Sequence, residues 1–137
     1  MVEKGYLEEI IENKLPKTWE ELGKISGWCV DNDDSRFIHI SNTKTFSANK
    51  NLFFSKEQAE ASLALAQLSQ LKQVYNDGWE PDYTMHNNKY IIYIFGNCIE
   101  TSIVTTELNF LAFKTADIRN EFLKNFKDLI EIAKPLL

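Results

Sequence analysis

Residues 55–78, SKEQAEASLALAQLSQLKQVYNDG, decide the fold more than any other stretch of this sequence. Ser55 opens a capping box, in which its hydroxyl accepts a hydrogen bond from an amide of the first turn, and strong helix formers follow it. The closing Asn-Asp-Gly is a combination that ends helices. The stretch therefore predicts a helix from Lys56 to about Tyr75.

Apolar side chains recur through this helix at the spacing of one broad face. Two further alanines, at 61 and 64, leave room for a neighbouring element to approach closely. We expect the face that points into the protein to consist of Ala59, Leu63, Ala66, Leu68, Leu71, Val74 and Tyr75.

The chain after this helix predicts an antiparallel sheet. Lys89–Phe95 is dense in isoleucine and aromatic residues, and Gly96-Asn97 is a tight-turn pair that leads into Cys98–Thr105. A further apolar run at Leu108–Phe113 adds a strand. The sequence thus predicts a meander of three antiparallel strands.

A second long helix follows the meander. Thr115 is suited to cap it, and the helix is expected over residues 116–133. Its apolar residues form one continuous stripe that could face the sheet or a second subunit. They are Ile118, Phe122, Phe126, Leu129, Ile130 and Ala133.

The N-terminal part predicts short elements. Gly5–Asn13 has the pattern of an amphipathic helix, and a Thr18-x-x-Glu21 capping box predicts another short helix over Trp19–Leu22. Strand-like runs follow at Trp28–Val30, Phe37–Ile40 and Leu52–Phe54. We expect residues 1–137 to form a single α+β domain: an antiparallel sheet of five to six short strands, covered on one face by two long helices, with short N-terminal helices.

Composition limits the function. The chain of 137 residues is 44% hydrophobic and 26% charged, which is typical of a packed domain. Its net charge of −5 argues against a basic face for direct nucleic-acid binding. No signal peptide and no apolar run of about 20 residues is present, so a cytoplasmic protein with no membrane contact is expected.

The two cysteines agree with a reducing compartment. Cys29 and Cys98 form no Cys-x-x-Cys pair, and both are expected to be buried thiols, although a disulfide between them stays open.

Two segments are candidate binding sites. In the stretch YNDGWEPDY, residues 75–83, the candidate residues are Tyr75, Trp79, Asp82 and Tyr83, because aromatic side chains with polar groups are enriched at binding hot spots. The alternative is that Trp79 and Tyr83 cover the hydrophobic core where the long helix leads into the sheet.

The second candidate is an acidic loop whose carboxylates could contact a basic partner: Asp31, Asp33 and Asp34. It opens like a calcium loop but has arginine where that loop needs glycine, so no metal is expected.

No catalytic motif is present. His39 and His86 have no spacing that predicts a triad, the chain has neither Gly-x-Ser-x-Gly nor His-Glu-x-x-His, and its glycines form no phosphate loop. We therefore expect neither enzyme activity nor a cofactor.

Several strings resemble small proteins encoded in prophages and other mobile elements of Bacteroidota. They are LPKTWEEL (15–22), FSKEQAEA (54–61), LALAQLSQL (63–71), YNDGWEPDY (75–83) and FKTADIRNEFLKNF (113–126). The resemblance implies a phage or mobile-element context and supplies no catalytic residue. Because small acidic phage domains without an active site often bind and disable a host protein, we expect a non-catalytic binding protein that inhibits or modulates a larger host or phage protein. The specific hypothesis is an anti-CRISPR protein acting on an RNA-guided nuclease, an RNase of the Cas13b type.

Two other functions stay open from the residues. One is an accessory nucleic-acid-binding protein of phage replication that uses lysine and aromatic side chains on an exposed strand face. The other is a hydrolase whose site is assembled from scattered residues. A homodimer is also open.

Overall fold

The computed structural model describes residues 15–19, 21, 25–30, 37–43 and 52–137, and of residues 25–26 and 37–43 it describes the backbone only. Within them the chain is an α+β protein with the element order β1 (Ile25–Val30), β2 (Phe37–Thr43), α2 (Lys56–Tyr75), β3 (Lys89–Phe95), β4 (Cys98–Val104), β5 (Leu111–Phe113), α3 (Ala116–Ala133) and the 3-10 helix η2 (Lys134–Leu136).

Both helices begin at the residues that the sequence indicates. The Ser55 hydroxyl accepts a hydrogen bond from the Gln58 amide at 3.1 Å, and the Thr115 hydroxyl accepts one from the Ile118 amide at 3.2 Å. Each cap satisfies a donor that the first helical turn leaves without a partner. The structure has helical segments over the predicted residue ranges, and the second of them, α3, has a kink at Phe126.

The C-terminal strands form a three-stranded antiparallel sheet in the order β4-β3-β5. The hairpin at Gly96 is confirmed, since Phe95 pairs with Cys98 on either side of the turn. The predicted meander has the wrong strand order, because β5 pairs with β3 and not with β4. Beside β3, Leu111 and Phe113 lie next to Ile92 and Tyr90 and are fully buried in the core.

Strands β1 and β2 form a separate two-stranded antiparallel sheet. The predicted strand at Leu52–Phe54 contributes a single bridge, in which Phe53 and Trp28 exchange two backbone hydrogen bonds of 2.7 Å. Gly27 allows this approach, because a Cβ there would lie 2.2 Å from the Phe53 carbonyl oxygen. One sheet of five or six strands is thus not confirmed among the described residues, whose five strands divide between two sheets.

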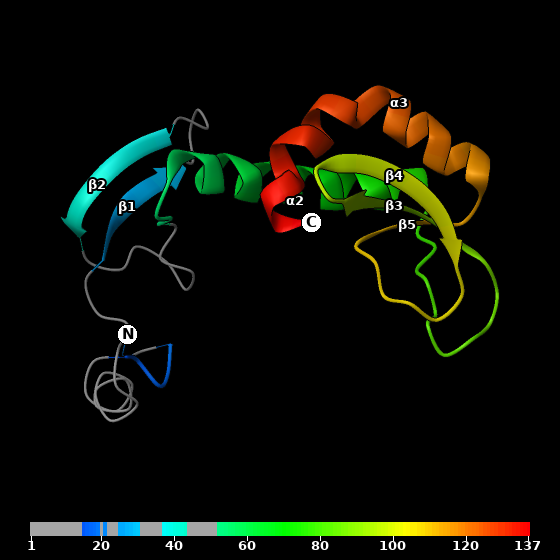
Figure 1. Cartoon of the computed structure of the whole chain (residues 1–137), viewed down its shortest axis with the longest axis horizontal. Coiled ribbons are helices and arrows are strands. Elements are labelled where there is room, and N and C mark those ends of the chain that lie inside the picture. The colour runs from blue at the N-terminus through cyan, green and yellow to red at the C-terminus, as the bar shows by residue number, and fades with distance from the viewer. Residues whose placement is uncertain (1–14, 20, 22–24, 31–36, 44–51) are drawn as a thin grey trace.

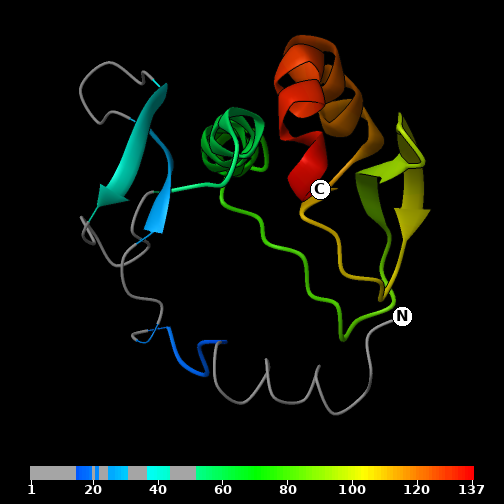
Figure 2. The same cartoon turned by 60° about the vertical axis from the view of Figure 1, so that its left-hand side comes forward.

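Helix α2 lies between the two sheets. Figure 1 shows β1 and β2 beside its first turns, and Figure 2, which looks nearly along α2, shows α3 and the three-stranded sheet on the opposite side. The strands form two sheets because α2 separates β1 and β2, which precede it in the chain, from β3, β4 and β5, which follow it.

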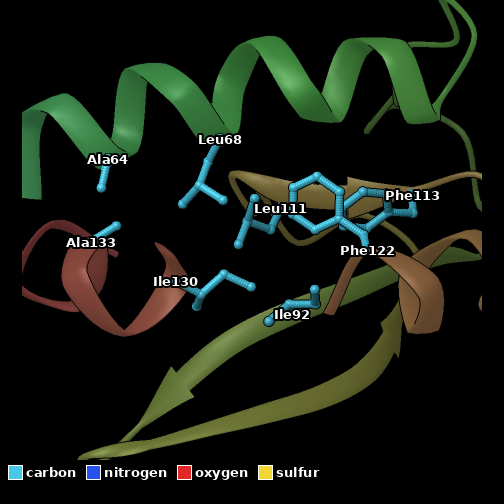
Figure 3. Packing of buried hydrophobic residues seen from close by; sticks show 8 residues of the cluster. All are labelled: Ala64, Leu68, Ile92, Leu111, Phe113, Phe122, Ile130 and Ala133. Atoms are coloured by element: carbon cyan, nitrogen blue, oxygen red, sulfur yellow. The ribbon is translucent and has the colours of Figure 1, made fainter. Parts of the chain in front are cut away.

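The main core lies where α2, α3, β3 and β5 meet (Figure 3). Leu68 of α2, Ile92 of β3 and Phe122 of α3 point into it and are 0–2% exposed. Burial of such large apolar side chains is the dominant favourable contribution to folding. The cluster consists of Ala64, Leu68, Ile92, Leu111, Phe113, Phe122, Ile130 and Ala133.

The inner face predicted for α2 is only partly correct. Ala61, Ala64 and Leu68 are buried against the neighbouring elements, whereas Ala66 is exposed and Val74 is 75% exposed. The small side chains of Ala61 and Ala64 bring α2 close to its neighbours. The larger Val74 lies about a third of a turn around the helix from these alanines and stays at the surface.

Three other predictions can be placed. Cys29 is buried, but Cys98 is exposed because it begins β4 directly after the hairpin turn; both thiols are free. The predicted helix at Gly5–Asn13 lies outside the described residues, as do two of the four residues of Trp19–Leu22. Among the helices that the structure describes, none has the length and apolarity needed to cross a bilayer.

Candidate binding site at the end of helix α2

A cleft of about 250 Å³ lies where α2 ends and the following loop turns back along it. Its walls come from the last two turns of the helix and from the loop, and half-buried Trp79 is its largest side chain. The lining residues are Ser69, Lys72, Gln73, Asn76, Trp79, Glu80 and Pro81. Of the four aromatic-turn candidates, Trp79 is the one that lines this cleft.

Asn76 fixes the base of the cleft to the sheet. Its side-chain amide donates a hydrogen bond to the Ala112 carbonyl at 3.0 Å and accepts one from the Lys114 amide at 3.2 Å. The residue is 3% exposed, so these two bonds replace the water that its amide loses. The end of α2 is thereby tied to β5.

The chain leaves α2 through a tight turn. Asp77 and Gly78 have φ values of 49° and 79°, in the left-handed region that ends helices. The Gly78 amide donates to the Gln73 carbonyl at 3.3 Å, and the Trp79 amide donates to the Asn76 carbonyl at 2.9 Å. These bonds hold the backbone that carries the Trp79 indole.

Lys72 forms the inner wall of the cleft. Its Nζ donates to the Phe110 carbonyl at 2.8 Å and lies 4.5 Å from the centre of the Phe110 ring. Burial lowers the pKa of this ammonium group, and the charge of Glu80 opposes that shift. The contact joins the end of α2 to the loop before β5.

Tyr75 belongs to the core and not to the cleft. Its ring lies edge-on to Phe122, with 5.1 Å between the centroids, and packs similarly on Phe126 at 5.5 Å. Its hydroxyl accepts a hydrogen bond from the Asn125 side chain at 2.9 Å. These contacts agree with the prediction that Tyr75 lies on the inner face of α2.

Tyr83 and Asp82 hold the far end of the loop. The Tyr83 hydroxyl donates to the Asn109 carbonyl at 2.9 Å, which ties this loop to the one before β5. An Asp82 oxygen accepts from the Thr84 hydroxyl at 2.6 Å and from the Thr84 amide at 2.9 Å. Chiefly because of these two hydrogen bonds, the pKa of the Asp82 carboxyl lies below its usual value.

Lys89 is a buried lysine that the sequence predicted only as the start of a strand. It is 0% exposed, and its Nζ donates to the Met85 carbonyl at 2.7 Å, the Asn87 side-chain oxygen at 2.9 Å and the Thr105 carbonyl at 2.5 Å. All three ammonium donors are therefore used. Lys89 joins the loop before β3 to the loop after β4.

The exposed surface of the turn is acidic and aromatic. Asp77, Glu80 and Asp82 are exposed within six residues of chain, and Trp79 stands among them. The sequence indicated this composition and placed Tyr75 on the inner face of α2, but it could not indicate that Tyr83 ties two loops together. It also gave no signal for the roles of Asn76 and Lys89.

The other predicted site residues are placed as follows. Asp31, Asp33 and Asp34 lie outside the described residues. His86 is exposed in the loop before β3, and of His39 the structure describes the backbone only. In the part of the chain that is described, no group of three or more His, Cys, Asp or Glu residues is arranged to hold a metal ion.

Comparisons with models of known protein families, with curated proteins and with solved structures found no match to this chain. The fold therefore places the chain in a class by its architecture alone: it is an α+β protein with a three-stranded antiparallel sheet and two helices.

Proposed function

We propose that the chain is a non-catalytic binding protein whose contact surface is the turn after α2. The observation that carries the proposal is a half-buried tryptophan beside a cleft, on a backbone that hydrogen bonds tie to the helix and the sheet. A fixed loop of this kind binds with little loss of conformational entropy, and tryptophan is enriched among residues that dominate binding energies.

The charge of the turn indicates the chemistry of the partner. Asp77 and Glu80 are exposed carboxylates, and the chain as a whole has a net charge of −5. Opposite charge accelerates association and selects among partners. A basic protein surface fits best, with an arginine that stacks on the Trp79 ring and pairs with Glu80.

In its specific form, the proposal is that the chain inhibits a larger host protein on behalf of a phage or mobile element. The resemblance of residues 15–22, 54–61, 63–71, 75–83 and 113–126 supports that context. An RNA-guided CRISPR effector, which presents extensive basic surfaces to its RNA, is a partner of matching charge.

The nucleic-acid alternative receives less support from the strands. It needs lysine and aromatic side chains on an exposed strand face, and Phe95 is indeed 73% exposed. However, Lys89, the only lysine of β3, β4 and β5, is buried, and Glu100 lies directly across from Tyr93. A strand face with a carboxylate in this position repels phosphate.

Titration of the protein into a purified Cas13b-type RNase, loaded with guide and target RNA, tests the proposal. We expect RNA cleavage to fall until about one protein per effector has been added, because one turn occupies one site. The same titration with the RNAs alone, followed by gel mobility at low salt, tests the alternative. Full cleavage at saturating protein would contradict inhibition of this effector, and retarded free RNA would favour nucleic-acid binding.

A further inference from the structure

An apolar groove runs between α2 and α3, on a different face of α2 from the candidate cleft. Two adjoining hollows of about 200 Å³ and about 420 Å³ form it and share Gln67 and Leu129. Val74 is 75% exposed and Ile132 is 47% exposed along its length. Large apolar side chains that remain exposed along one groove mark an interaction surface.

The α2 side of the groove has one charged residue, Glu60 at one end, and the next three turns of the helix are free of charge. Between Glu60 and Lys72 the helix sequence, ASLALAQLSQL, contains no charged residue. An exposed helix face ordinarily carries charged side chains. Here Gln67 and Gln70 are the exposed polar residues, and they can donate and accept hydrogen bonds without an opposite charge.

The groove residues of α2 follow the spacing of a helix–helix seam. Leu63, Gln67, Gln70 and Val74 are separated by four, three and four residues, which places them in one line along the helix. Two copies of α2 can pack antiparallel along this line, with the twofold axis between residues 68 and 69. Leu63 of one copy then lies opposite Val74 of the other, and Gln67 lies opposite Gln70. Apolar residues then meet apolar residues, and amides meet amides.

We propose that this groove is a homodimer interface, in which α2 of one copy packs antiparallel against α2 of a second copy. A twofold axis requires a self-complementary surface, and the seam has that property. Each copy has a net charge of −5, so two copies approach at least electrostatic cost along the stretch of α2 between Glu60 and Lys72, which has no charge. A basic partner would instead be drawn to the acidic turn after α2.

Charge substitution at the centre of the seam tests the proposal. We expect the wild-type protein to have twice the 15.9 kDa chain mass in sedimentation equilibrium between about 1 and about 200 μM. The variants Gln67→Lys/Gln70→Lys and Gln67→Glu/Gln70→Glu should each be folded by circular dichroism, since both positions are exposed, and should dissociate at least about tenfold more readily. An equimolar mixture of the two should restore the dimer, because lysines then face glutamates.

The matched control is Thr101→Lys/Thr106→Lys, which makes the same charge change at exposed positions outside the groove. It should leave the mass doubled. A mass of 15.9 kDa over the whole concentration range would overturn the proposal and leave the groove to a different protein. A dimer that both seam variants preserve would overturn it as well. Neither result depends on the turn after α2, so the proposed function is tested separately.

Discussion

Phe122→Ala is expected to lower the free energy of unfolding by about 3–5 kcal/mol, because it removes a fully buried ring from the centre of the core. The ring lies between three others, with centroids 4.8 Å from Phe113, 4.9 Å from Phe126 and 5.1 Å from Tyr75. The truncation leaves a cavity and removes these aromatic contacts at once. Urea unfolding followed by circular dichroism measures the change.

Phe54→Ala is the matched control for this prediction. Phe54 is 91% exposed, so the same truncation there should change the free energy of unfolding by no more than about 0.5 kcal/mol. Equal loss of stability in both variants would contradict the position of the core at Phe122.

Lys89→Met is expected to destabilise the protein by about 3 kcal/mol or more. Methionine fills a similar volume, but the Met85 carbonyl, the Asn87 side chain and the Thr105 carbonyl lose their common donor. Each hydrogen bond to a charged group contributes about 1.5–3 kcal/mol. The midpoint of urea unfolding should fall, with little change in its slope.

Lys114→Met provides the comparison, since Lys114 has an exposed side chain. It should leave the midpoint nearly unchanged. If Lys89→Met were as stable as the wild type, the three acceptor oxygens would have to find water instead. Lys89 would then not be the link between the loop before β3 and the loop after β4.

Local sequence signals predicted the helices and the hairpin. Ser55 and Thr115 cap their helices through contacts within one turn, and Gly96 permits the turn between β3 and β4 at a φ of 62°. These interactions involve neighbours in the chain, so residue type and spacing are sufficient to indicate them.

Pairing between distant segments could not be predicted in this way. Strand β5 follows β4 in sequence, but Leu111 and Phe113 find their buried positions beside β3. Similarly, the sequence of α2 indicates an apolar face and a close approach at Ala61 and Ala64, without indicating that Val74 turns outward. The deciding quantity is the fit between side chains of separate elements, which no single stretch of sequence contains.

The candidate site likewise combines features that local sequence indicates with features that depend on tertiary contacts. Composition indicated an acidic, aromatic turn at residues 75–83, and the structure places Trp79 of this turn at a cleft. Tyr75 and Tyr83 have the same residue type but bond to Asn125 and to Asn109, which are far along the chain. Helical periodicity had placed Tyr75 on the inner face of α2, whereas the role of Tyr83 depended on tertiary contacts alone.

Binding of a purified, guide-loaded Cas13b-type RNase, measured by calorimetry with variants of the turn, tests the proposed contact surface most directly. Trp79→Ala should raise the dissociation constant about thirtyfold and Glu80→Lys at least about tenfold, because the first removes the anchoring ring and the second reverses the charge that faces the basic partner. The controls Phe95→Ala and Glu100→Lys make similar changes at exposed positions of the hairpin and should bind like the wild type. Absence of wild-type binding, or equal losses in the turn variants and the controls, would contradict recognition through the turn after α2.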